Sequence, residues 1–213
     1  MPRGLHWTKA KEVQMANPYL QALEPAGPKP LAPSQLALRE ALVELMDERG
    51  YEHVDVVALC SRAFVSRSTF YSHYHGVDEL LQELETFHVA NISRLSSPIS
   101  KVSDAASNDL SFYEKTFDYV TDNRRAVRVL LSGSPGQRFA TQWKTAIKMH
   151  LWDRSERRGT AVPSDFELEI LSSAVIAGYA YYLDHPTRVS RDQVLNVVRS
   201  FLSALDNDLK TRL

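Results

Sequence analysis

The chain has 213 residues, with 25 Lys plus Arg against 26 Asp plus Glu and a formal net charge of −1. At about 150 residues per domain, this length predicts one or two domains. The near-neutral charge excludes a protein that coats nucleic acid or an anionic membrane through bulk charge, so any contact with DNA must be local. No apolar run approaches the ~18 residues of a membrane span. We therefore expect a protein without membrane contact.

The single cysteine, Cys60, excludes an internal disulfide framework and a Cys-rich metal site. Residues 1–33 contain six of the ten prolines and lack the apolar segment of a secretory signal. These features predict a cytoplasmic protein whose residues 1–33 form a flexible, Pro-rich tail. The alternative for this segment is a weakly basic arm that adds phosphate or minor-groove contacts.

Scarce glycine and missing strand patterns predict an all-α fold. Seven of the eight glycines lie in the tail or at apparent element boundaries, as expected for helices, because a glycine inside a helix costs ~1 kcal/mol relative to alanine. The only alternating candidate, residues 54–57, is four residues long and continues directly into a helical pattern.

Four helices are predicted in the N-terminal part. The first begins at Ser34 as N-cap, ends at Gly50, and buries Leu38, Ala41, Leu42, Leu45 and Met46. The second begins at Asp55 and reaches a turn near Phe64, with Cys60 on its buried side as a small core residue. The third runs from Ser66 to about Tyr74. The fourth follows Gly76 and uses Leu80, Leu81, Leu84, Phe87, His88 and Asn91.

A Ser-rich stretch at residues 96–107 separates these helices from the rest. Three capping-box patterns then predict helix starts at Ser111, Ser164 and Ser190. The turn at residues 133–136 separates a helix at 124–132 from one at about 137–157, and two further helices are expected at 165–184 and 191–209.

The last two predicted helices carry unusually wide apolar stripes. Such stripes can bury one side on their own domain and the other on a second copy, as in a homodimer formed through a four-helix bundle. The candidate interface residues are Ala174, Gly178, Tyr181, Val198, Phe201 and Leu205.

Residues 50–74 indicate a helix, a tight turn and a second helix. Eight helical residues span about 12 Å, which is comparable to the width of a DNA major groove. Ser66, Ser68 and Thr69 can donate hydrogen bonds to phosphates from the first turn of the second helix. The planar guanidinium of Arg67 suits the two acceptors of a guanine.

This segment resembles the N-terminal helix-turn-helix of TetR/AcrR-type transcriptional regulators. The matching residues are Gly50-Tyr51, Ala63, Val65-Ser66, Thr69-Phe70-Tyr71, His73-Tyr74 and Asp78-x-Leu80-Leu81. The resemblance implies a DNA-binding domain at residues 34–81 and a helical ligand-binding and dimerisation domain at 82–213. It also implies a homodimeric repressor that binds a palindromic operator in double-stranded DNA and responds to a small-molecule effector.

By the same resemblance, one set of residues faces bases or phosphates: Asp55, Val56, Ser66, Arg67, Ser68, Thr69, Tyr71, Ser72 and His73. Phe70 and Tyr74 alternate with that set, so we expect them in the core. Surface packing is the alternative for Tyr71.

Three positions depart from the family pattern. Phe64 and Ser68 replace glycines, and because Phe is unfavourable at positive φ, we expect a different turn or a packing role for Phe64. Val77 replaces a lysine that contacts the DNA backbone in the family. Residues 34–81 have four basic and eight acidic residues, and we expect the acidic ones on helices that flank or lie behind the reading helix. These features also motivate an alternative, a co-regulator that acts through protein contacts.

Nothing in the sequence indicates catalysis, a metal site or a cofactor. The seven histidines are scattered, and there is no phosphate-binding glycine loop or nucleophile elbow. Aromatic residues on the later helices can line an apolar effector pocket or form plain core. Our candidates for the pocket are Tyr113, Phe117, Phe139, Trp143 and Ile147.

Overall fold

The computed structural model describes residues 31–95, 108–133 and 135–211, and every regular element in these ranges is helical. The helices are α2 (Pro33–Arg49), the 3₁₀ turn η2 (Tyr51–His53), α3 (Val56–Ala63), α4 (Arg67–Tyr71), α5 (Val77–Leu95), α6 (Asn108–Asp122), α7 (Arg124–Leu131), α8 (Gly136–Arg158), α9 (Asp165–Asp184) and α10 (Arg191–Thr211). The all-α expectation is confirmed.

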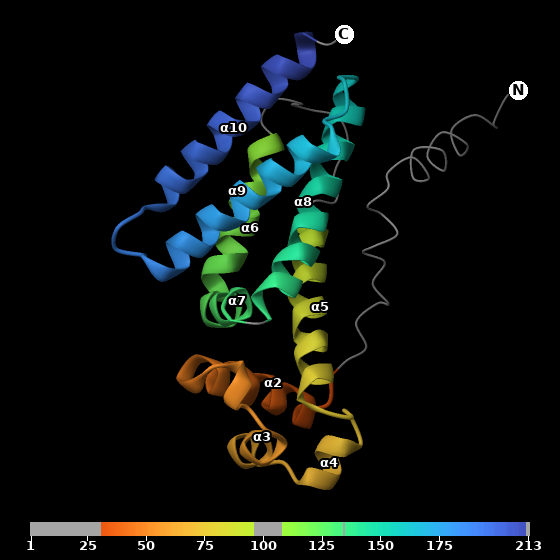
Figure 1. The fold of residues 1–213 in the computed structure, drawn as a ribbon, viewed down its shortest axis with the longest axis vertical. Helices are drawn as coiled ribbons and strands as arrows, with labels where there is room; N and C mark the ends of the chain where they lie inside the picture. The colour runs from red at the N-terminus through yellow and green to blue at the C-terminus, as the bar shows by residue number, and fades with distance from the viewer. Residues whose placement is uncertain (1–30, 96–107, 134, 212–213) are drawn as a thin grey trace, which may run out of the picture.

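Helices α2, α3 and α4 gather at one end of the molecule, together with the beginning of α5 (Figure 1). The apolar face predicted for the first helix is buried in full, from Leu38 to Met46. Leu59 of α3, Phe70 of α4 and Leu80 of α5 complete this core, each with no exposed surface. Burial of one apolar face per helix therefore holds the short helices α3 and α4 in place.

Helix α5 connects the two parts of the chain. Its first turn belongs to the N-terminal core, and its later turns run beside α8 in the larger bundle (Figure 1). The predicted inward positions are buried at Leu84 and His88, but Phe87 is 40% exposed. The expectation for Phe87 is wrong, because the buried face of α5 is the one that contacts α6 and α8. The guanidinium of Arg39 lies over the Phe87 ring, 4.8 Å from its centroid.

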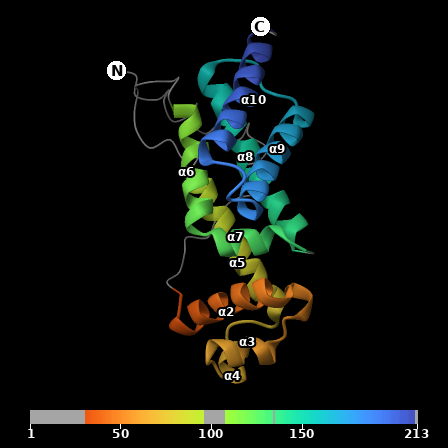
Figure 2. The same cartoon turned by 90° about the vertical axis from the view of Figure 1, so that its left-hand side faces the viewer.

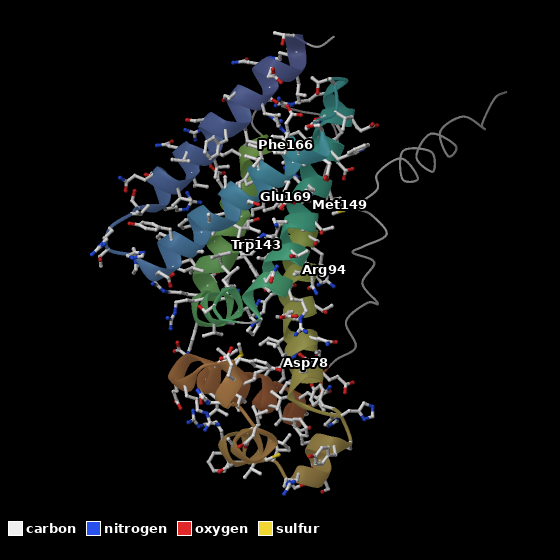
Figure 3. All side chains as sticks on the ribbon, viewed as in Figure 1. Asp78, Arg94, Trp143, Met149, Phe166 and Glu169 are labelled. Carbon is white, nitrogen blue, oxygen red and sulfur yellow. The ribbon has the colours of Figure 1, made fainter. Side chains whose placement is uncertain are left out.

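Helices α6 to α10 form the second, larger bundle. The long α8 packs against α5, α7 and α9, and α9 pairs with α10 on the outer side (Figure 2). Helix α7 lies directly above α2, so it brings the bundle into contact with the N-terminal helices (Figure 2). Trp143 lies within the bundle, whereas Asp78 lies where α5 leaves the N-terminal part (Figure 3).

Two of the three predicted capping boxes are confirmed. Ser164 Oγ accepts from the N–H of Glu167 at 3.3 Å, and Glu167 accepts from the N–H of Ser164 at 2.7 Å. Ser190 and Gln193 exchange the equivalent bonds at 3.2 and 2.8 Å. The prediction at Ser111 is wrong, because α6 already begins at Asn108 and this serine lies inside the helix.

The N-cap of the first helix lies two residues earlier than predicted. Ala32 is its N-cap, Pro33 opens the first turn, and Gln35 Oε1 accepts from the Ala32 N–H at 3.0 Å. Proline suits this position because the first helical N–H has no partner within the helix. The Ser34 cap is therefore wrong. Most of the tail predicted at residues 1–33 lies outside the described residues.

Candidate nucleic-acid interface

The two short helices of the N-terminal domain begin at side-chain caps. Asp55 Oδ1 accepts from the N–H of Ala58 at 2.7 Å, which starts α3 where the sequence predicts it. Ser66 Oγ accepts from the N–H of Thr69 at 3.1 Å and lies 2.9 Å from Ser68 Oγ. These caps satisfy backbone donors that a helix start otherwise leaves free.

The buried side of α4 anchors it to the domain. Phe70 is fully buried and Tyr74 nearly so, which confirms the core role predicted for both. The Tyr74 hydroxyl donates to Glu83 at 2.9 Å and accepts from Gln35 Nε2 at 3.3 Å. Burial raises the pKa of Tyr74 to about 12, so this hydroxyl keeps its proton near neutral pH. The reading helix therefore has a fixed orientation although regular helical geometry ends at Tyr71, earlier than predicted.

The opposite side of α4 faces solvent. Ser66, Arg67, Ser68, Tyr71 and Ser72 are exposed, as is Asp55 at the head of α3, whereas Val56 and Thr69 are half-buried. Arg67 makes no hydrogen bond or ion pair with any described residue. Among the predicted contact residues, His73 differs most, because its Nε2 lies 3.1 Å from Ser34 Oγ in α2. One of its ring nitrogens is thus already engaged within the domain.

The turn between α3 and α4 keeps a left-handed residue at Phe64, with a φ of 54°. Both expectations for this residue are wrong: the turn is not rebuilt to avoid positive φ, and the ring, at 97% exposed, packs against nothing. The backbone explains the conformation, because the N–H groups of Phe64 and Val65 close the end of α3 by bonding to carbonyls of Ser61 and Cys60.

Most acidic residues in the range 34–81 lie on α2 and at the start of α5, as predicted, and several of them bind arginines of other helices. Asp47 of α2 binds Arg125 at 2.9 Å and also binds Arg128, both in α7. Asp78 and the fully buried Glu85 of α5 bind Arg138 of α8 at 3.2 and 2.7 Å. Three further pairs, of Arg62 with Glu44 and with Glu48 and of Arg39 with Glu83, join α2 to α3 and to α5. Four of the eight acidic residues in the range 34–81, Glu44, Asp47, Glu48 and Asp78, thus form ion pairs between helices.

The five residues predicted for an effector pocket lie together in the core of the larger bundle, each at most 2% exposed. Trp143 stacks on Tyr179 with ring centroids 5.6 Å apart, and Phe139 and Phe117 adjoin the same pair. The Tyr179 hydroxyl donates to the backbone carbonyl of Tyr113 at 3.0 Å. Sequence reasoning did not select Tyr179, although its aromatic type and place in the apolar stripe of α9 were a usable signal.

Three polar atoms in this core have no hydrogen-bond partner among the described residues: the Tyr113 hydroxyl, the Thr116 hydroxyl and the Trp143 indole N–H. A buried polar atom without a partner costs about 1–3 kcal/mol. Thr116 was missed by sequence reasoning, because a threonine within a helix carries no distinguishing signal.

Two histidines are buried in this bundle. His88 of α5 lies 2.7 Å from the Tyr119 hydroxyl, and burial lowers its pKa to about 4. His150 of α8 stacks on Phe112 at a centroid distance of 4.1 Å, and burial lowers its pKa to about 3. Both rings are therefore neutral near pH 7.

The outer face of α9 and α10 has an apolar groove of about 300 Å³. It is lined by Ala174, Gly178, Tyr181, Val189, Gln193, Val194, Val197, Val198 and Phe201. Five of the six predicted interface residues are in this lining, while Leu205 is buried in the domain itself. Tyr181 and Phe201 remain 48% and 40% exposed beside the groove.

Within the described ranges, no three His, Cys, Asp or Glu side chains are grouped so as to hold a metal ion. Among the described helices, none is long and apolar enough to cross a membrane. Cys60 is buried, as predicted, and burial raises the pKa of its thiol.

Residues 38–84 match the family model described as "Bacterial regulatory proteins, tetR family". No curated protein matches the chain. Among solved structures, a TetR-family transcriptional regulator from Syntrophomonas wolfei is 15% identical, with a TM-score of 0.65 over 81% of this chain and 94% of that one. A TetR regulator from Streptococcus agalactiae is 19% identical, with a TM-score of 0.60 over 93% and 97%. The dihydroxyacetone kinase operon activator DhaS is 16% identical, with a TM-score of 0.53 over 84% and 97%.

Proposed function

We propose that this chain, which belongs to the TetR family of bacterial regulatory proteins, is a ligand-responsive repressor that binds a palindromic DNA operator as a homodimer. Members of this family are DNA-binding transcriptional regulators, and the family is not enzymatic. Reading an operator would place it in the cytoplasm, where bacterial DNA is located.

The observation that carries this proposal is the two-sided character of α4. Phe70 and Tyr74 fix one side in the core, while Arg67 and Ser68 stand exposed on the other. The N-cap serine leaves the head of α4 at the surface, where a phosphate can approach it. A short, rigid helix with exposed donors suits major-groove recognition.

A second copy of the chain would supply the second α4 helix that a palindromic operator requires. The groove between α9 and α10 and the aromatic side chains beside it supply both hollow and protruding elements on one face, as a two-fold interface requires. Two α4 helices about 34–36 Å apart would then enter successive major grooves.

An effector would act through the aromatic core. The unpartnered groups of Tyr113, Thr116 and Trp143 offer hydrogen bonds to a small molecule that inserts among these rings. A molecule that favours a conformation with another spacing of the two α4 helices would weaken DNA binding by population shift. Regulators of this fold need not all repress, since DhaS is named an operon activator, and the reporter experiment below decides the sign.

The test of DNA reading is a selection of duplexes from genomic fragments, followed by a salt series on the bound fragment. A DNA reader loses affinity steeply as salt rises, because phosphate contacts release counterions. The alternative, a co-regulator that acts through protein contacts, predicts that no fragment is retained even at low salt. A reporter gene placed behind the selected fragment, with and without the regulator, then distinguishes repression from activation.

A further inference from the structure

Phe64 occupies a backbone conformation that does not suit it. It is the only non-glycine residue with positive φ in the described ranges. The β-carbon of an L-residue disfavours this region, which glycine enters freely. The hydrogen bonds that close the turn come from backbone N–H groups, so a glycine would form them equally well. Nothing in the turn itself requires an aromatic side chain.

Burial does not explain the side chain either. At 97%, Phe64 is the most exposed of the large apolar residues that the structure describes. A second large apolar residue, Val57 in the first turn of α3, is 58% exposed. The free protein therefore carries both backbone strain and an uncovered ring at one position. A contact made only in a complex accounts for both.

The location of Phe64 indicates which complex this is. The residue stands two positions before Ser66, the N-cap of the reading helix α4, and close in sequence to the exposed Arg67 and Ser68. The α3–α4 turn lies at the end of the molecule farthest from α9 and α10 (Figures 1 and 2). It is therefore remote from the proposed dimer face and adjacent to the proposed DNA face.

Resting on the proposed function, we infer that Phe64 is a DNA-contact residue. Its ring packs on the apolar parts of the groove wall, the thymine C5-methyl groups and the deoxyriboses, beside the bases that α4 reads. Apolar side chains recognise thymine methyls in this way. A protein partner fits less well, because a stable protein interface buries about 800 Å² per side and the exposed residues nearest in sequence to Phe64, Ser61, Ser66, Arg67 and Ser68, are all polar.

The protein-side test uses full-length variants and duplexes of about 30 base pairs that the wild-type protein selects from a random pool. We expect Phe64→Gly to raise Tm by about 2 °C, because backbone strain is relieved, and to weaken DNA binding about tenfold. Phe64→Asn, which also tolerates positive φ, should behave similarly. Phe64→Leu keeps an apolar side chain and should retain most of the affinity. The slope of affinity against salt should stay unchanged in all three, since no phosphate contact is lost.

The DNA-side test replaces single thymines of the selected duplex by deoxyuridine. If the ring contacts a methyl group, one replacement weakens wild-type binding and leaves Phe64→Gly unaffected. If it contacts deoxyriboses only, Phe64→Gly binds weakly and no single replacement matters.

Phe64→Gly binding DNA as tightly as wild type overturns the inference while leaving the proposed function intact. Weaker binding accompanied by a lower Tm also overturns it, because the loss then reflects a damaged fold. If wild-type protein selects no duplex at all, the proposed function and this inference both fall.

Discussion

The carboxylate of Asp47 in α2 binds the guanidinium of Arg128 in α7 and so joins the N-terminal helices to the larger bundle. Arg125, one turn earlier in α7, binds the other carboxylate oxygen at 2.9 Å. Glu44, one turn earlier in α2, lies 4.0 Å from Arg125 and binds Arg62 of α3 at 2.9 Å. A row of ion pairs thus leads from α7 across α2 to the first helix of the helix-turn-helix.

We expect Asp47→Asn to lower the free energy of unfolding by about 0.5–1 kcal/mol, because the ion pairs it removes are partly exposed and screened. Urea denaturation in low salt measures this, and the difference should shrink in high salt. Glu40→Gln is the matched control, since Glu40 is an exposed acidic residue of the same helix. Equal effects of the two substitutions would contradict the role assigned to Asp47.

Because the guanidinium of Arg67 is exposed, we expect its removal to reduce the sequence preference of DNA binding. Arg67→Ala should weaken binding to the selected duplex by ~1–3 kcal/mol and reduce discrimination against altered bases. Competition assays with single-base variants measure both quantities. Arg94→Ala is the control, because Arg94 lies well away from α4, farther along α5 (Figure 3). Unchanged discrimination in Arg67→Ala would remove this residue from base reading.

For Tyr113 and Tyr179 in the aromatic core, we expect the substitution of tyrosine by phenylalanine to change the free energy of unfolding in opposite directions. Tyr113→Phe should raise the free energy of unfolding by about 1 kcal/mol, because it removes a buried hydroxyl without a partner among the described residues. Tyr179→Phe should lower it by a similar amount, because it deletes the bond to the Tyr113 carbonyl. Thermal and urea unfolding of both variants and the wild type at one pH measure these changes in the free energy of unfolding. A loss of stability in Tyr113→Phe would show that its hydroxyl has a partner.

His88 predicts a loss of stability in acid. Burial lowers its folded pKa to about 4 from the usual histidine value of about 6.5, so the unfolded chain binds a proton first as the pH falls below about 6.5. The resulting loss grows until the folded pKa is reached and amounts to about 3 kcal/mol. His88→Gln should show a flatter pH dependence than wild type between about pH 7 and pH 4. Parallel curves for the two proteins would refute this origin.

If the proposed dimer forms through the groove beside Phe201, we expect a charged side chain at this position to disrupt it. Phe201→Glu should convert the dimer to monomer in sedimentation velocity and weaken operator binding, because a buried carboxylate would face the apolar groove. Leu36→Glu is the control, since Leu36 is comparably exposed but lies on α2. A wild-type protein that sediments as a monomer at micromolar concentration would contradict the proposed interface.

Local patterns predicted most of the fold. The caps at Asp55, Ser66, Ser164 and Ser190 form as their side chains indicate, because such caps depend on residues only three positions apart. The same pattern fails at Ser111, which lies inside α6 because the helix begins at Asn108. A capping-box pattern therefore predicts a helix start only where the preceding residues do not themselves continue the helix.

The exposed side of α4, the candidate DNA-binding face, was also predictable from local sequence patterns. The alternation of Phe70 and Tyr74 with exposed neighbours follows from helical periodicity, and the structure confirms it. The conformation of Phe64 was not predictable, because backbone hydrogen bonds at the end of α3 outweigh the strain on a single residue.

By itself the sequence determined an all-helical chain, a helix-turn-helix near its beginning and the identity of the side chains that can face DNA. Only the tertiary structure decided where the acidic residues point, since Asp47 and Asp78 find their arginine partners 78 and 60 residues away. It also decided which core polar groups lack partners and which aromatic side chains remain exposed. Those properties depend on the packing of helices distant in sequence, which helical periodicity alone does not specify.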